Sequence, residues 1–352
     1  MVQGTAIINW TAAKYFLIHR LYILHQLDGI EIKNALNTLP VTSGNRIPCY
    51  DQCMPQPVHL AGPVLERIVA IVQPILIFAM LFLTFCRIEP RELRPHNWHW
   101  WLLLIQGASF TLLGLSIALL SHFHPGRIFE YKVLVESAML CLICPTATAA
   151  AVVTRKLGGD VPGITTYTIL INILTALLVP LIVPLIQPMS EMTFWDAFCR
   201  ILAKVFPLLI MPCFAAWLVR YLFPSLHRLI LSKPDLPFNI WAVSLSLAIA
   251  VTVKAIVHST MPVYLMLLIA LVSLICCALQ FTIGHKLGSL LGQSDMQVTA
   301  GQALGQKNTV FAIWMGYTFM TPETAIVGGF YSIWHNLYNS YQLKRHQDIR
   351  KM

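Results

Sequence analysis

The stretch that decides the fold lies near the C-terminus and reads "TAGQALGQKNTVFAIWMGYTF" (residues 299–319). Its second half is mostly apolar, yet Lys307 stands at its centre, after Gly301 and Gly305 and within a polar run. An ionisable residue at membrane depth is energetically costly, and it marks a functional site by default. The stretch therefore predicts a membrane helix that is interrupted at its middle and carries a cation there.

The composition of the chain supports a membrane location. Of its 352 residues, 57% are hydrophobic and 11% are charged, whereas soluble domains carry about 25% charged residues. The net charge of +9 would by itself also fit a nucleic-acid-binding protein. The basic residues, however, lie in short clusters between apolar runs, which is typical of loops beside a membrane. We expect an integral membrane protein in a lipid bilayer, with no nucleic-acid partner.

Nine apolar segments have about the 20 residues that a helix needs to cross the hydrocarbon layer. They lie near residues 66–86, 99–121, 131–154, 163–187, 195–223, 236–257, 261–284, 296–319 and 322–343. The loops between them are short and rich in Pro, Gly, Asp and Ser, as expected between packed helices. The stretch "NWHWW" (97–101) is typical of an interfacial aromatic belt. The predicted fold class is an all-α integral membrane protein.

Basic residues are distributed unevenly between the two sets of alternate loops. Thirteen lie in one set and the tail: Arg87, Arg91, Arg94, Arg155, Lys156, Arg220, Arg228, Lys233, Lys286, Lys344, Arg345, Arg350 and Lys351. Five lie in or near the opposite set: Arg127, Lys132, Arg200, Lys204 and Lys254. The positive-inside rule predicts that the first set and the C-terminus face the cytoplasm. We expect a multi-pass protein of the cell (inner) membrane.

Residues 1–65 fit this pattern less well. The run "IINWTAAKYFLIHRLYILHQL" (7–27) is apolar on average, but Lys14 and Arg20 interrupt it. This pattern favours an interfacial amphipathic helix followed by an irregular linker, with a poor spanning helix or disorder as alternatives. Cys49 and Cys53 in the linker are candidates for a disulfide. The other cysteines lie in or beside apolar segments, where a thiol is usually a small buried hydrophobe.

A second interrupted segment reads "LICPTATAAAVVTRKLGGD" (142–160). Pro145 removes a helix hydrogen bond and clashes with the preceding turn. The small and Thr-rich residues after it allow a neighbouring helix to approach closely. Two interrupted segments in corresponding halves of a membrane protein indicate the binding site of a transporter.

These motifs resemble those of the bile acid:sodium symporter family. The similarity covers residues 66–343 and is carried by "CPTATAAAVV" (144–153), "GGDV" (158–161), "LGQKNTVFA" (304–312) and "GGFYSIWHNLYNS" (328–340). The stretch "FAMLFLTFCRIEPRELR" (78–94) looks like the family's second helix and the turn after it. The resemblance implies a secondary transporter of small organic anions, coupled to sodium in that family.

By the same resemblance, nine to ten transmembrane helices form two inverted repeats, with two broken helices crossing in a core domain beside a panel domain. The first repeat is expected at 66–187, with a panel helix at 66–86 and core helices at 99–187. The second is expected at 188–343, with panel helices at 195–257 and core helices at 261–343. A basic cytoplasmic tail at 344–352 follows. Residues 1–65 match the family's first helix poorly.

The family builds its sodium sites from side-chain oxygens around the crossing, and this chain departs from that pattern. At the matching positions it has Ala150 and Ala151 for a Ser–Asn pair, Ile164 and Thr168 for a Ser and a Thr, Ala303 for a shared Glu, and Lys307 for a Gln. The matching Gln106 and Asn308 are retained. Sodium is a hard cation that requires several oxygen ligands, by the logic that holds for calcium. Sodium at these positions is therefore unexpected.

Lys307 adds a second argument against sodium, because a protonated lysine has three donors and no acceptor. At 4 Å, two unit cations repel by about 4 kcal/mol at an effective dielectric constant of about 20, or about a thousandfold in affinity. We expect the ammonium to replace the bound cation and to donate to carbonyls freed at the helix break, or to Thr168 and Gln106. Three alternatives stay open: a permanent internal cation, a lysine that exchanges a proton during transport, and sodium bound elsewhere.

Further substrate or coupling residues are expected around the two breaks, namely Thr146, Thr148, Asn308, Thr309, His335 and Asn336. His335 and Asn336 belong to a family-like "SIWHN" motif (332–336), and helix packing is the alternative for both. The other intramembrane charge, Glu136, is expected to pair with Lys132 or with a lipid-facing water shell, with a role in transport and a pair with Lys307 as alternatives.

Other classes of protein find less support in the sequence. An enzyme needs an intramembrane acid–base or nucleophile constellation, and a channel needs a continuous polar stripe, and neither pattern is present. We expect no enzymatic activity, no cofactor and no bound metal. A non-transporting membrane sensor built on a transporter fold remains an alternative.

Overall fold

The computed structural model describes residues 56–123, 129–187, 192–233, 236–257, 261–291 and 294–351. The expectations for an interfacial helix and for a Cys49–Cys53 pair lie outside these residues. The chain divides into residues 1–60 and 61–352, and the packing given below is that of the second unit. The described residues are helical apart from turns, short irregular segments and one isolated β-bridge.

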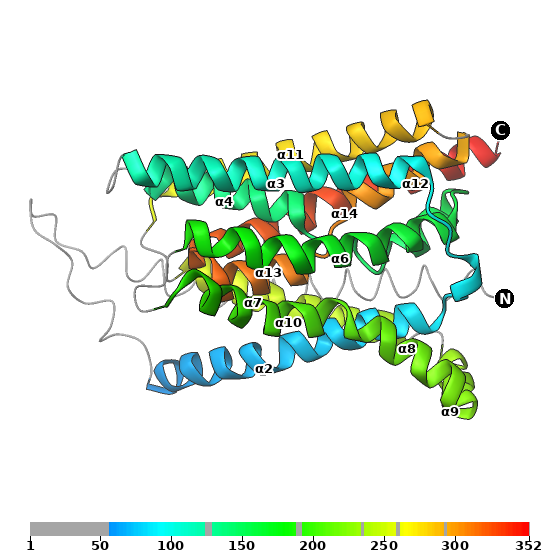
Figure 1. The fold of residues 1–352 in the computed structure, drawn as a ribbon, viewed down its shortest axis with the longest axis horizontal. Coiled ribbons are helices and arrows are strands. Elements are labelled where there is room, and N and C mark those ends of the chain that lie inside the picture. The colour runs from blue at the N-terminus through cyan, green and yellow to red at the C-terminus, as the bar shows by residue number, and fades with distance from the viewer. Residues whose placement is uncertain are drawn as a thin grey trace, which may run out of the picture. The chain divides into compact units, whose positions relative to one another are not determined.

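The first part of the described chain contains α2 (Gln56–Cys86), η1 (Pro90–Glu92), α3 (Asn97–Phe123), α4 (Phe129–Ile143), α5 (Ala150–Lys156) and α6 (Val161–Ile186). The second part contains α7 (Phe194–Leu209), α8 (Met211–Leu222), α9 (Pro224–Leu231), α10 (Leu236–Val257), α11 (Val263–Leu291), α12 (Ser294–Gly305), α13 (Thr309–Phe319), η2 (Pro322–Ala325) and α14 (Ile326–Lys351). Figure 1 shows the long helices running side by side. Each of the nine predicted apolar segments falls on a helix or on a pair of helices.

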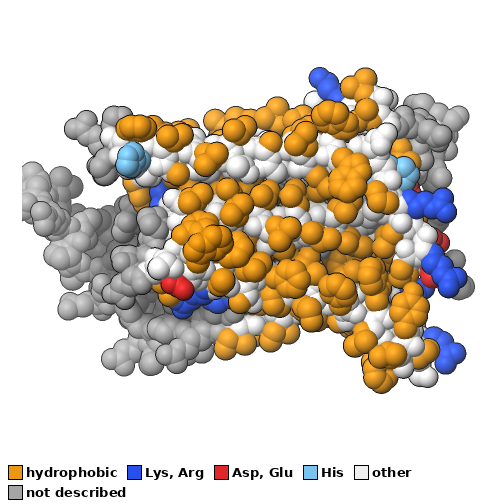
Figure 2. All heavy atoms as spheres, in the orientation of Figure 1, with side chains coloured by type: hydrophobic (Ala, Val, Ile, Leu, Met, Phe, Trp, Pro, Cys, Tyr) orange, Lys and Arg blue, Asp and Glu red, His pale blue; other side chains and the backbone are white. Residues whose placement is uncertain are grey.

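Four of these helical stretches are long and apolar enough to cross a membrane by length and composition: α3, α6, the α7–α8 pair and α11. Their outward faces carry exposed leucines such as Leu112 on α3 and Leu267 on α11. Figure 2 shows hydrophobic side chains spread over the visible face of the described part. These features are consistent with a multi-pass membrane protein.

The structure corrects the sequence-based expectations at several places. The predicted segment at 195–223 is one candidate span, Phe194–Leu222, but it is divided into two helices at Ile210, because Pro212 at the start of α8 has no backbone N–H to continue the ladder. The connection after residue 223 contains the helix α9. The predicted tail at 344–352 continues α14 as far as Lys351. In "NWHWW", Trp100 and Trp101 are exposed as in a belt, but Trp98 is buried.

The helices on either side of the two breaks make corresponding contacts. α3 packs against α4 and α6, and α11 packs against α12 and α14. α5 contacts α6 and α12, and α13 contacts α14 and α4. The same order of contacts therefore occurs in the first and second halves of the chain.

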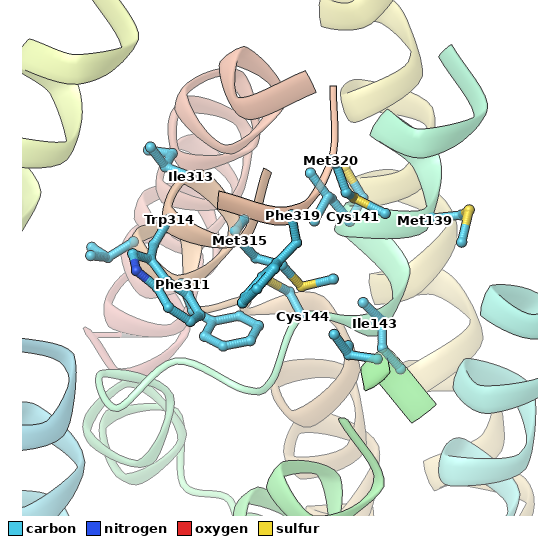
Figure 3. Close-up of a cluster of buried hydrophobic side chains, with 14 of the residues drawn as sticks. Met139, Cys141, Ile143, Cys144, Phe311, Ile313, Trp314, Met315, Phe319 and Met320 are labelled. Atoms are coloured by element: carbon cyan, nitrogen blue, oxygen red, sulfur yellow. The ribbon is translucent and has the colours of Figure 1, made fainter. Parts of the chain in front are cut away.

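Two apolar clusters surround the breaks. The larger one, which extends from α2 to α14, includes Met315 and Phe319 of α13 beside Cys144 at the end of α4, as Figure 3 shows. The smaller one is formed by Trp98, Leu102, Leu103, Ala150, Ile164, Tyr167, Ile171, Ala300, Ala303 and Leu304. We call this smaller set the alanine cluster. It lies where α3, α5, α6 and α12 meet, and so next to the crossing.

Candidate functional site

The two broken helices meet at their interruptions, as the sequence predicted. Between α4 and α5, and between α12 and α13, the chain leaves the helix and forms an antiparallel β-bridge that pairs Thr146 with Lys307. The backbone N–H of Ala147 donates to the carbonyl of Gln306 at 2.8 Å, and that of Asn308 donates to the carbonyl of Pro145 at 2.8 Å. Backbone hydrogen bonds thus join the two breaks directly.

The end of α4 leaves carbonyl groups without a partner inside the helix. Side chains supply it instead. The donors are Gln280 Nε2 to the Cys141 carbonyl (3.1 Å), Lys307 Nζ to Leu142 (3.3 Å), Thr175 Oγ1 to Ile143 (3.0 Å) and Gln106 Nε2 to Cys144 (3.2 Å). Four consecutive carbonyls therefore each receive a side-chain donor.

At the second break, side chains also pair with the free backbone groups. Thr146 Oγ1 donates to the Ala303 carbonyl at 2.7 Å, and the Tyr331 hydroxyl donates to the Gly305 carbonyl at 2.7 Å. Asn308 is the N-cap of α13, and its Oδ1 accepts from the backbone N–H of Phe311 at 3.2 Å. Thr146 therefore holds the crossing together through its hydroxyl.

Lys307 lies deep in this arrangement, with 1% of its surface exposed. Of the two sets of partners expected for its ammonium, the structure shows the freed carbonyl. Thr168 Oγ1 donates instead to the Ile164 carbonyl at 2.8 Å, and Gln106 Oε1 accepts from the Tyr167 hydroxyl at 2.6 Å. A cation at the C-terminal end of a helix is favoured by the helix dipole. The Lys307 ammonium thus caps α4 from a neighbouring chain segment.

The positions matched to the family's sodium ligands lie mostly in the alanine cluster. Ala150, Ile164 and Ala303 are at most 1% exposed and are members of this cluster, and Ala151 packs against it. The oxygen of Gln106 is occupied by Tyr167, and Thr168 bonds to its own helix. A hard cation needs several oxygen ligands, and the residues at these positions present mainly carbon.

A cleft opens beside the crossing. On one side it is lined by Ala147, Thr148, Ala149, Gln306, Lys307, Asn308, Thr309 and Val310. On the other it is lined by Met80 of α2, Trp241 of α10, and Ser332, His335 and Asn336 of α14. The cleft therefore brings together five of the predicted residues besides Lys307, namely Thr148, Asn308, Thr309, His335 and Asn336. Thr146, Gln106 and Thr168 are not among its lining residues.

Three buried polar atoms at this cleft have no hydrogen-bond partner among the described residues: Gln306 Oε1, Asn308 Nδ2 and His335 Nδ1. A buried polar atom without a partner is unusual in a folded protein. Gln306 was not predicted from the sequence, although it flanks Lys307 as Asn308 does. Met80 and Trp241 were missed because neither is polar or charged, and their sequence context gives no other signal.

Glu136 forms a separate polar site on α4. Its side chain is fully buried and lies 3.8 Å from Lys132 Nζ, which confirms the predicted pair. It also accepts from Gln187 Nε2 at 2.9 Å and from the backbone N–H of Thr321 at 3.0 Å. These contacts join α4 to the end of α6 and to the segment that follows α13. They involve no contact with Lys307.

The apolar helices and the crossing of two broken helices define a protein of the membrane-transporter class. The model of the SBF-like CPA transporter family matches residues 62–343. The chain belongs to this family, and the resemblance found in the sequence is thereby confirmed. No curated protein matches the chain.

Proposed function

We propose that this protein is a secondary transporter of small organic anions that works without sodium, with the Lys307 ammonium in place of the bound cation. One observation carries the proposal. Lys307 caps the end of α4, while Ala150, Ile164 and Ala303, at the matched sodium positions, are buried in the alanine cluster. In this proposal, the positive charge at the crossing is thus part of the chain.

We infer that the helices form two inverted repeats, with α3–α6 and α11–α14 as the core and α2, α7, α8 and α10 as the panel. The corresponding contacts of α3 and α11 support this arrangement. A further pair of contacts supports it: Thr299 of α12 accepts from the Asp160 backbone after α5 at 2.7 Å, and Glu136 of α4 accepts from the Thr321 backbone after α13 at 3.0 Å. The basic loops favour a cytoplasmic C-terminus in the cell membrane.

The hydrogen bond of Lys307 favours the hypothesis of a permanent cation over the hypothesis that Lys307 exchanges a proton during transport. Lys307 Nζ donates at 3.3 Å to the Leu142 carbonyl, a backbone acceptor that belongs to the fold itself. Removal of the proton would weaken this bond and remove the charge that complements the end of α4. Transport is then driven by the gradient of the substrate itself.

An anionic substrate is favoured by the lining of the cleft. The N-terminal end of α13 contributes Asn308, Thr309 and Val310, and the N-terminus of a helix attracts anions. The free Asn308 Nδ2 is a donor without a partner among the described residues, and none of the described lining residues is acidic.

Uptake into vesicles tests this proposal. Purified protein in liposomes is offered a panel of radiolabelled organic anions under imposed sodium, potassium or pH gradients. We expect uptake of at least one anion at equal rates in sodium and potassium, and its loss in Lys307→Met. A strict requirement for a sodium gradient overturns the sodium-free mechanism and favours sodium sites elsewhere. Acceleration by a pH gradient selects the proton-coupled version.

Counterflow separates a transporter from a sensor on the same fold. Liposomes preloaded with unlabelled substrate should accelerate entry of labelled substrate if the protein transports it. Specific binding without counterflow would overturn the transport function and favour the sensor.

A further inference from the structure

The helix α9, which the sequence did not predict, is fixed to the end of α2. It follows α8 after one residue, and the ring Nε2 of the buried His227 lies 2.8 Å from the Cys86 carbonyl. Arg220 at the end of α8 forms an ion pair with Glu89, and Arg87 donates to the Lys233 carbonyl at 3.2 Å. These contacts hold α9 in a defined place beside the last turn of α2.

One side of α9 presents hydrophobic side chains away from these contacts. Leu226 and Leu229 are 46% and 58% exposed and lie one turn apart. They continue the exposed apolar surface of Leu222 and Phe223 at the end of α8. In Figure 2, hydrophobic side chains lie beside a Lys or Arg side chain at the corner that α9 occupies in Figure 1. Since α7–α8 is a candidate membrane span, this surface leads directly out of the bilayer core.

The charge on α9 has a single sign. Among Lys, Arg, Asp and Glu, α9 contains Arg228 alone; Arg220 precedes the helix, and Lys233 follows it, with Asp235 two residues further on. Arg228 and Lys233 are exposed, and neither side chain has an acidic partner among the described residues. A short helix with an apolar side and flanking cations is suited to the boundary between lipid headgroups and acyl chains.

We propose that α9 lies in the membrane interface and binds the headgroup of an anionic phospholipid, with Leu226 and Leu229 among the acyl chains and Arg228 and Lys233 at the phosphate. Positive charge complements an anionic headgroup, and each basic residue near such a surface contributes about fivefold to binding. The continuity of the apolar surface with α8 favours lipid over a soluble protein partner. Because α9 is attached to α2 through His227 and Arg87, a bound lipid also steadies the end of that helix.

Native mass spectrometry of the full chain in detergent tests the proposal, with phosphatidylglycerol and phosphatidylcholine added in equal amounts. We expect the wild type to retain phosphatidylglycerol preferentially. The double variant Arg228→Gln/Lys233→Gln should lose about 25-fold in affinity for it, with no change toward phosphatidylcholine. The matched control Lys286→Gln removes an exposed cation from α11 and should leave the preference unchanged.

Three results would overturn the proposal. They are equal retention of both lipids by the wild type, unchanged retention of phosphatidylglycerol by the double variant, and an equal loss in the Lys286→Gln control. Inorganic phosphate that displaces the lipid at millimolar concentration would point to a free-anion site and would also overturn it. If the double variant does not fold, the charge-preserving Arg228→Lys/Lys233→Arg should keep the preference, and its loss would count against the proposal. Uptake of substrate is a separate readout, so this outcome does not depend on the transport function.

Discussion

The two sides of the helix crossing differ in chemistry. On one side, Lys307, the Gln280 amide and the Thr175 hydroxyl donate to carbonyls at the end of α4 that have no partner within the helix. On the other side, Ala150, Ile164 and Ala303 pack with Tyr167 in the alanine cluster. A bound cation would have needed oxygen ligands on this second side. Under the proposed mechanism, the charge fixed on the first side is what makes an apolar filling of the second side possible.

The largest effect is expected for Ala303→Glu, which places a carboxylate in the alanine cluster. Ala303 is fully buried among carbon atoms, and an uncompensated buried charge costs about 3–5 kcal/mol. We expect a matching loss in the free energy of unfolding, measured by thermal melting in detergent, in sodium and in potassium alike. The matched control Ala303→Ser should cost only about 0.5 kcal/mol.

A specific rise in the melting temperature of Ala303→Glu in sodium chloride, absent in potassium chloride, would contradict this view of the crossing. It would mean that enough oxygens remain nearby to complete a sodium site. The wild type should show no difference between the two salts.

The next largest effect on stability is expected for Lys307, on the first side of the crossing. Lys307→Met removes the donor to the Leu142 carbonyl and leaves a part-buried acceptor unpaired, which costs about 1–3 kcal/mol. We expect lower thermal stability together with loss of uptake, whereas Lys307→Gln, which keeps a donor, should retain more of both. The exposed Lys286→Met is the control and should change stability by less than about 0.5 kcal/mol. Wild-type stability in Lys307→Met would show that the ammonium does not cap α4.

The sequence predicted the two breaks because proline removes a helix hydrogen bond, glycine weakens a helix, and a charge at membrane depth is costly. Pro145, Gly305 and Lys307 stood out for this reason, and both predicted interruptions are present. It also predicted the Lys132–Glu136 pair, whose members are one helical turn apart. Local sequence suffices where the physical cause is local.

The partners of the freed carbonyls were beyond the reach of the sequence. Gln280, Thr175 and Tyr331 come from helices far along the chain, and nothing in their own segments marks them as caps. The helix α9 was missed because its apolar residues and its Arg228 resemble an ordinary basic loop. Trp98 was assigned to an interfacial belt because a single sequence does not show which tryptophan faces the core.

Tyr167→Phe probes the boundary between the two sides with a smaller effect. The Tyr167 hydroxyl donates to Gln106 Oε1 at 2.6 Å, and Gln106 in turn donates to the Cys144 carbonyl. Removal of the hydroxyl should cost about 1.5 kcal/mol, measured by thermal melting. It also frees the Gln106 oxygen, which matches a family sodium ligand. Sodium-dependent uptake in Tyr167→Phe would mean that this hydroxyl, rather than Lys307, keeps sodium out.

The smallest stability effect is expected for variants of Asn308. They separate the role of this residue in the fold from its role in transport, because the two ends of its amide differ in their contacts. Oδ1 caps α13 by accepting from Phe311, while Nδ2 is the unpartnered donor at the cleft. Asn308→Ala should lose the cap, at about 1 kcal/mol, and should also lose uptake. Asn308→Asp keeps an acceptor for the cap but replaces the donor by a negative charge, so it should retain stability and still fail to take up an anion. If Asn308→Asp transports like the wild type, the amide does not contact the substrate, and the role of Asn308 is confined to capping α13.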